Sequence, residues 1–244
     1  MKNDVRIYAD PTSLALAAAD FITELAAACM AARGAFNIAL SGGSTPRALY
    51  GVLASRGAQI NWSGWHCFWG DERCVPPDHD DSCYRMAREA LLDHVAIPDS
   101  QVHRIPGELT PPDAASSYEQ VLREFFKGEW PRFDLILLGM GDDAHTASLF
   151  PETAALDRHD SWVTANYAPT AIQPNRITLT IPAINATANI LFLAAGSSKA
   201  APLHQVIDGA RNPRHLPAQF IQPAAGSLTW MIDQPAAALL QTKR

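Results

Sequence analysis

The chain has few cysteines, no C-x-x-C pair and no long uninterrupted apolar run among its 244 residues. The four cysteines and the histidines near them match no structural zinc spacing, so we expect reduced thiols and no metal site. The alanine-rich segment 13–32 contains Asp20 and Glu24, which favours a helix of a soluble protein over a membrane span. Because the first residues lack the apolar core of a signal peptide, we expect a cytoplasmic protein.

A large excess of charge is also absent, since 19 Lys and Arg residues stand against 25 Asp and Glu residues, a net charge of −6. This balance, without any basic stripe, argues against a nucleic-acid partner. It leaves a small anionic substrate open, because local Arg and Lys side chains set the field inside a cleft. The chain contains no repeat and no low-complexity linker, so one domain over residues 1–244 is the simplest interpretation.

Helical and strand-like segments alternate along the chain. Helices are predicted at 12–32, 46–56, 83–94, 113–127, from Lys199 to about 208 and at 234–241, and strands at 36–41, 65–69, 133–138, 161–166, 175–181, 189–194 and 227–232. Strands separated by helices predict an α/β fold with a mostly parallel sheet covered by helices on both faces.

The segment Gly139 to Pro151 carries the strongest chemical signal. Its glycines end the apolar run 133–138, and Asp143 and His145 then stand at the predicted start of an alanine-rich helical turn. Ligands of open α/β sheets bind outside the carboxyl ends of the strands. A histidine there, two residues after a carboxylate, fits a general base that the carboxylate orients. The alternative is an aspartate that caps a helix, beside an incidental histidine.

A second glycine-rich loop follows the apolar run 36–40. It reads Ser41, Gly42, Gly43, Ser44, Thr45 and Pro46, and a helical pattern comes next. Backbone N–H groups, hydroxyls and the positive end of the helix dipole would suit a phosphate. The loop is neither a Walker A nor a G-x-G-x-x-G motif, so a plain capped turn is the alternative.

Charged residues follow other predicted strands. Asp71 and Arg73 come just after the strand ending at Trp69, and an arginine there could bind a phosphate or carboxylate. Lys199 falls in a first helical turn, which is unfavourable for a cation unless an anion is near. The alternatives are an internal Glu–Arg pair, a solvated lysine and, for Arg176, a side chain facing solvent. The acidic run 78–81 is best interpreted as a solvated loop.

With these residues the chain resembles the glucosamine-6-phosphate deaminase/6-phosphogluconolactonase family, and its lactonase branch most closely. The strongest matches are 41–46, 70–88, 138–151 and 176–180. The resemblance implies the Rossmann-like α/β fold shared with glucosamine-6-phosphate deaminase and ribose-5-phosphate isomerase. It also implies hydrolysis of 6-phospho-D-glucono-1,5-lactone in the pentose phosphate pathway, without a metal or organic cofactor.

For this function we predict that His145 is the general base and that Asp143 orients it. The predicted substrate and phosphate contacts are Ser41, Gly42, Gly43, Ser44, Thr45, Asp71, Arg73, Arg176 and Lys199. Two positions depart from the family pattern: Ala144, where glycine is frequent, and Cys83, where asparagine is frequent. Ala144 fits the pattern if its φ is negative, and Cys83 removes an amide donor.

Two other functions stay open. An amino-sugar-phosphate deaminase or isomerase would have a glutamate where this chain has Phe150, and it tends to have a tyrosine where this chain has Arg73. A non-catalytic sugar-phosphate sensor would keep the glycine loop and lose His145. These positions favour the lactonase over both alternatives.

Overall fold

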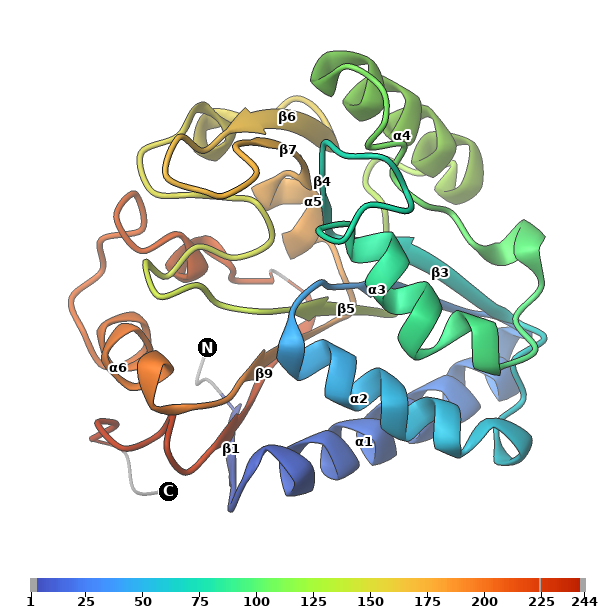
Figure 1. Ribbon diagram of the computed structural model, residues 1–244, viewed down its shortest axis with the longest axis horizontal. Coiled ribbons are helices and arrows are strands. Elements are labelled where there is room, and N and C mark those ends of the chain that lie inside the picture. The colour runs from blue at the N-terminus through green and yellow to red at the C-terminus, as the bar shows by residue number, and fades with distance from the viewer. Residues whose placement is uncertain (1–3, 224, 242–244) are drawn as a thin grey trace.

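The computed structural model describes residues 4–223 and 225–241 and is built on a parallel sheet of six strands (Figure 1). The strands lie in the order β1 (Asp4–Tyr8), β9 (Ser227–Asp233), β8 (Asn189–Ala194), β5 (Leu135–Leu138), β2 (Phe36–Leu40) and β3 (Trp65–Trp69). Nearly every side chain of the four strands from β8 to β3 is buried, as expected for a parallel sheet covered on both faces. All carboxyl ends therefore meet at one edge, where the predicted loops follow.

The helices flank this sheet. They are α1 (Pro11–Arg33), α2 (Ser44–Ser55), α3 (Cys83–Ala90), α4 (Pro111–Phe126), α5 (Ile181–Asn185) and α6 (Ala200–Ile207). Six 3₁₀ turns join them within the described residues: Gly57–Gln59, Leu92–His94, Asp99–Gln101, Ala154–Asp157, Ser197–Lys199 and Pro217–Phe220. Figure 1 shows α1 and α2 side by side below the sheet and α4 above it. The predicted α/β architecture is confirmed.

A second sheet holds three short strands, β4 (Asp71–Arg73), β7 (Asn175–Leu179) and β6 (Val163–Tyr167), in the order β4-β7-β6. Its strands are antiparallel, and Arg73 lies opposite Arg176 in the register. Gly70 joins the two sheets, because its N–H donates to Leu40 and its carbonyl accepts from Leu179. The small sheet thus brings two distant arginines together at the carboxyl edge of the large one.

Helix α1 is long and apolar enough to cross a membrane by length and composition alone. In the structure one of its faces is buried, through Leu14, Ala18, Ile22 and Ala26 at the i, i+4 spacing of a packed helix. Asp10 caps its first turn by accepting from the N–H of Ser13. The helix thus packs as a core element beside α2 and β9.

The predicted helix at 234–241 is wrong, because the segment forms consecutive turns after β9. Its bonds run from Ala237 N–H to the Asp233 carbonyl and from Leu240 N–H to the Ala237 carbonyl. The segment buries little, and an isolated helix this short is marginal without burial of an apolar face. Strands β1 and β4 were not predicted, since one is a half-exposed edge and the other has three residues.

Candidate active site

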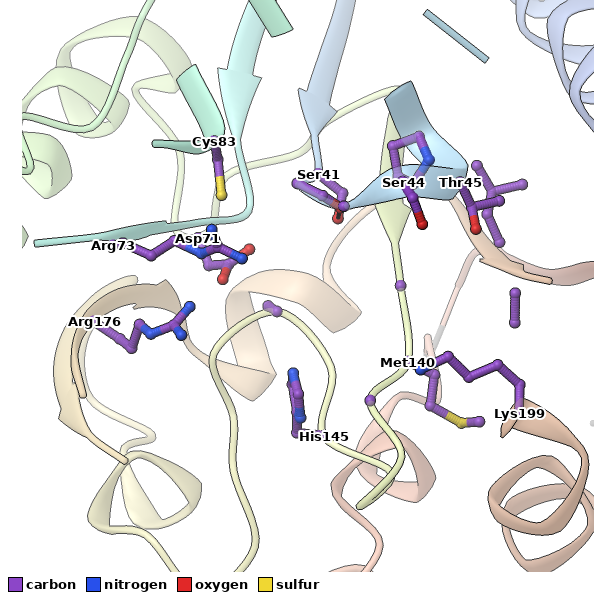
Figure 2. A pocket seen from close by; sticks show the side chains of 18 residues that line it. Ser41, Ser44, Thr45, Asp71, Arg73, Cys83, Met140, His145, Arg176 and Lys199 are labelled. Carbon is purple, nitrogen blue, oxygen red and sulfur yellow. Dashed lines mark hydrogen bonds between the residues drawn. The ribbon is translucent and has the colours of Figure 1, made fainter. Parts of the chain in front are cut away.

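A cleft of about 260 Å³ opens at the carboxyl ends of the central strands (Figure 2). It brings together residues predicted from five separate segments: Ser41, Gly42, Gly43, Ser44, Thr45, Asp71, Arg73, His145, Arg176 and Lys199. Asp143 is the one predicted residue that does not line the cleft, and it contacts the Nδ1 atom of His145. The shared location supports one site, and the role of each residue stays a prediction.

The His145 imidazole and the Asp143 carboxylate form the central pair. His145 Nδ1 lies 2.5 Å from Asp143 Oδ1, and the same oxygen accepts from the His145 backbone N–H at 3.1 Å. Burial acts to raise the pKa of Asp143, but these bonds and the charge of His145 outweigh it and lower that pKa. With a proton on Nδ1 held by Asp143, Nε2 keeps a lone pair for a substrate or a water.

The ring of Phe150 supports the imidazole from one side. The two rings stack with centroids 4.1 Å apart and planes 23° apart. A side chain on Gly141 would collide with the same imidazole, because a Cβ there would lie 2.1 Å from Nδ1. Gly141 therefore leaves room for the imidazole, and Phe150 holds the ring in position by stacking on it.

The backbone around His145 corrects one prediction and decides one condition that the sequence left open. The segment forms tight turns, with Ala144 N–H donating to the Gly141 carbonyl, and no helical turn follows the aspartates. Ala144 has a φ of 61°, so the condition under which alanine would fit the family pattern, a negative φ, is not met. Ala147 also has a positive φ, of 47°. Non-glycine residues rarely adopt this conformation, and it costs roughly 1–2 kcal/mol each.

Ser148 anchors this loop to the second sheet. Its hydroxyl donates to Asp71 at 2.6 Å, its N–H donates to the Thr178 hydroxyl at 3.2 Å, and its carbonyl accepts from Asn166 at 2.8 Å. Ser148 is fully buried, and its role was not predicted from the sequence. Its position three residues after His145 in the long matching segment was the available signal.

Arg73 and Arg176 form one wall of the cleft, and both are held by backbone carbonyls. Arg73 donates to the Asp81 carbonyl and Arg176 donates to the Gln173 carbonyl, each at 2.5 Å. Neither has an ion-pair partner among residues 4–223 and 225–241, and the Arg73 Nε is buried without any partner. Arg176 is 8% exposed, and burial lowers its pKa although Asp71 acts to raise it. A buried or half-buried guanidinium group with no carboxylate at ion-pair distance favours binding of an anion.

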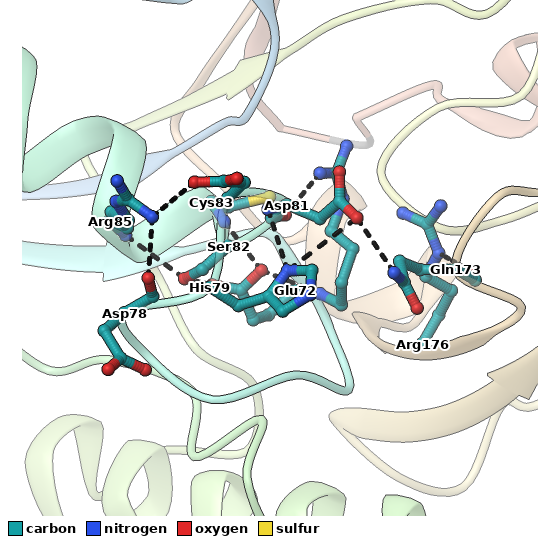
Figure 3. Close-up of polar contacts among 11 residues, drawn as sticks. Glu72, Asp78, His79, Asp81, Ser82, Cys83, Arg85, Gln173 and Arg176 are labelled. Atoms are coloured by element: carbon teal, nitrogen blue, oxygen red, sulfur yellow. Dashed lines mark hydrogen bonds and ion pairs between the residues drawn. The ribbon is translucent and has the colours of Figure 1, made fainter.

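The alternative of an internal Glu–Arg pair at this wall is wrong. The buried Glu72 carboxylate instead accepts from the N–H groups of Arg73, Cys83 and Tyr84 and from the Ser82 hydroxyl (Figure 3). It thereby ties β4 to the start of α3 and leaves the Arg73 guanidinium to the cleft.

The acidic run 78–81, predicted to be a solvated loop, lies at the surface but is tied at both ends (Figure 3). Arg85 binds Asp80 and the Asp78 carbonyl, and the Gln173 amide donates to Asp81. No group of three or more potential metal ligands occurs in the part of the chain that the structure describes.

The glycine loop forms the opposite wall. Helix α2 begins at Ser44, and its N-cap, Gly43, has a φ of 104° and supplies no side-chain cap. The Tyr50 hydroxyl holds the loop by donating to the Ser41 carbonyl and accepting from its N–H. A Cβ on Gly42 would lie 2.6 Å from the Cys83 sulfur, so glycine is required there. The first N–H groups of α2 therefore have no side-chain cap and can bind an anion.

Lys199 borders the same wall, at the start of α6. The sequence predicts a substrate phosphate as the anion near this lysine; in the structure its ammonium lies 2.6 Å from Asp142 Oδ1, and the phosphate contact stays a prediction. Asp142 itself is 70% exposed, so a substrate anion can compete with it.

The sequence and the fold of this chain are both similar to those of 6-phosphogluconolactonases. Residues 9–230 match the family described as glucosamine-6-phosphate isomerases/6-phosphogluconolactonase. A 6-phosphogluconolactonase of Nostoc is 44% identical over 98% of this chain and 99% of its own length. The solved 6-phosphogluconolactonase of Trypanosoma cruzi is 29% identical, covering 99% of this chain and 98% of its own, with a TM-score of 0.88. A monomeric glucosamine-6-phosphate deaminase, 20% identical over 97% of this chain and 99% of its own, shares the fold alone, with a TM-score of 0.81.

Proposed function

The chain belongs to the glucosamine-6-phosphate isomerase/6-phosphogluconolactonase family, and we propose that it opens its lactone with His145 as the general base. It is a lactone-hydrolysing enzyme that converts 6-phospho-D-glucono-1,5-lactone to 6-phosphogluconate in the pentose phosphate pathway. The observation that carries the residue assignment is the His145–Asp143 pair between two cationic walls of one cleft. We place the activity in the cytoplasm and in one domain.

The two walls match the two ends of the substrate. The phosphate would bind the uncapped start of α2, at Ser44 and Thr45, together with the ammonium of Lys199. The lactone carbonyl would face Arg73 and Arg176, whose charge would stabilise the oxyanion. A phosphate dianion suits that second wall less well, because the Asp71 carboxylate lies beside the arginines. Asp71 would instead accept hydrogen bonds from sugar hydroxyls.

The reaction then needs one proton carrier. His145 Nε2 removes a proton from water as the water oxygen forms a bond to the lactone carbonyl carbon. The tetrahedral intermediate collapses by breaking the bond to the ring oxygen, which takes the proton back from Nε2. Asp143 keeps Nδ1 protonated and stabilises the imidazolium between the two steps. The new carboxylic acid then ionises and releases one proton to solvent.

The stacking of Phe150 on His145 favours this chemistry over the deaminase alternative. An acidic side chain at 150 would be available for proton transfers on an amino sugar, whereas a phenyl ring can only support the imidazole. A sensor would not need the histidine, the carboxylate and the tight turns that hold them.

The test is acid release from freshly generated 6-phosphogluconolactone in weak buffer with a pH indicator. We expect a rate above the spontaneous one that is proportional to protein concentration and is lost in His145→Gln. Ammonia released from glucosamine 6-phosphate, without acid release from the lactone, would contradict the proposal in favour of the deaminase. Tight sugar-phosphate binding with neither product would indicate the sensor.

A further inference from the structure

We infer that Asp233 is a positioning residue for Lys199. It lies far from His145 along the chain. The inference rests on the proposed function, because it assigns Lys199 to the phosphate of the substrate. Asp233 ends strand β9 and its side chain is fully buried, with 0% exposure. No basic side chain forms an ion pair with it among the described residues.

The bonds of this carboxylate lead directly to the lysine. Both oxygens of Asp233 lie 3.0 Å from the N–H of Gly196, and Oδ1 also accepts from Ala236 N–H at 2.9 Å. Gly196 has a φ of 93° and starts the 3₁₀ turn Ser197–Lys199. Asp233 therefore fixes the first backbone group of the turn that presents the ammonium to the cleft.

The C-terminal segment also holds the far end of α6. The N–H of Gln241 donates to Asp208 at 2.9 Å, directly after the helix that Lys199 begins. The turns from Asp233 to Gln241 thus contact both ends of the segment that bears the lysine.

A charged anchor is costly at a fully buried site. Burial of a carboxylate is unfavourable unless hydrogen bonds compensate, and among the described residues only two backbone N–H groups do so, those of Gly196 and Ala236. A neutral residue could close the same turn at lower cost. The carboxylate, however, can accept from Gly196 with both oxygens and so restricts the direction of that N–H.

The experiment compares the affinity for 6-phosphogluconate, measured by calorimetry, in wild type, Asp233→Ala, Asp233→Asn, Lys199→Ala and the double variant Asp233→Ala/Lys199→Ala. We expect Asp233→Ala to weaken binding about 10- to 100-fold, close to Lys199→Ala, through loss of one charge-assisted contact. Asp233→Asn, which keeps one acceptor oxygen, should be intermediate. KM should rise far more than kcat falls. The double variant should bind no more weakly than Lys199→Ala.

Asp134→Ala is the control away from the site, since it removes another buried carboxylate, which accepts from the Asn37 N–H and pairs with Arg33 at the opposite end of the sheet. It should lower thermal stability and leave the affinity unchanged. Wild-type affinity in the folded Asp233→Asn and Asp233→Ala variants, or losses that add fully in the double variant, would overturn the inference. If Lys199→Ala bound as wild type, the phosphate assignment would fail first, and the inference with it.

Discussion

The two cationic walls of the cleft are built differently. Arg73 and Arg176 are largely buried, are held by backbone carbonyls and have no ion-pair partner within the described chain. Lys199 is tied to an exposed carboxylate, that of Asp142. The arginine wall is therefore a preorganised positive field, which the charge developing on the carbonyl oxygen would neutralise. Under the proposed assignment, the lysine wall would have to exchange the Asp142 carboxylate for the substrate phosphate.

This difference predicts different roles for the two walls. A fixed positive field costs no reorganisation when charge develops, so its largest effect should fall on the rate of the chemical step. A contact that replaces an existing ion pair holds substrate and transition state alike, so it should affect affinity. His145 lies between the walls and belongs to neither, which allows its effect to be separated from both.

Removing the base should give the largest effect. His145→Ala should lower kcat by about 10²–10⁴-fold, the range of a positioned general base. Both walls stay intact, so the affinity for 6-phosphogluconate should change little. Turnover is measured by acid release and affinity by calorimetry, with His215→Ala, an exposed histidine, as the control. Near-normal turnover would remove His145 from the mechanism.

The walls themselves are compared by Arg176→Met and Lys199→Met. Each change removes one charge-assisted contact, about 1.5–3 kcal/mol or roughly 10- to 150-fold. We expect the arginine variant to have mainly a lower kcat and the lysine variant to have mainly a higher KM. Arg104→Met, which breaks an ion pair with Glu108 away from the cleft, is the control. The opposite split would mean that the substrate lies the other way round.

How the walls form explains what the sequence could and could not predict. The parallel strands were predictable because their apolar runs are continuous, and strands β3 and β8 match their predicted bounds. The loops at their carboxyl ends follow from that sheet, since parallel strands place those ends at one edge. The approach of Arg73 to Arg176 depends on the pairing of β4 with β7, a contact between residues a hundred positions apart.

The unpredicted parts are those where tertiary contacts override local pattern. Ala144 takes a positive φ because His145, Phe150 and the Ser148 anchor fix the loop around it. The partner of Lys199 could not be read from spacing, because Asp142 reaches it from another strand end.

The two walls can be compared at different pH values only while the protein stays folded. A pair of histidines away from the cleft limits the pH range in which it does. His66 Nδ1 lies 3.2 Å from His103 Nε2, and both rings pack against Phe125. Burial, and secondarily the charge of His66, lowers the pKa of His103 to about 4. In the unfolded chain His103 binds a proton near about pH 6.5. Above that pH the residue is neutral in both states, and it does not lower the free energy of unfolding.

As pH falls from about 6.5 to about 4, the unfolded state gains a proton that the folded state resists. The whole difference between pKa values of about 6.5 and about 4 would be worth about 3 kcal/mol. Because His103 is only partly buried and solvent screens its charge, we expect the free energy of unfolding to drop by about 1–2 kcal/mol over this range and then to stop changing on account of this group. Urea unfolding at pH 8 and pH 5 measures the drop, and His103→Phe should reduce it. An unchanged drop in that variant would assign the acid sensitivity to other groups.

The smallest effect should come from the competitor at the lysine wall. Asp142→Asn removes the carboxylate that Lys199 must leave, while keeping a side chain of the same shape. An exposed ion pair is worth about 0–1 kcal/mol, so the affinity for 6-phosphogluconate should rise by up to about fivefold. The gain should shrink at high salt, which screens exposed charges.

Asp157→Asn, which weakens a surface ion pair with Arg214 away from the cleft, should leave that affinity unchanged. Weaker binding in Asp142→Asn would reverse the interpretation, because Asp142 would then hold the ammonium in place for the phosphate. In that case Lys199 would be as preorganised as the arginines. The two walls would then differ only in what orients them, carboxylates for the lysine and backbone carbonyls for the arginines.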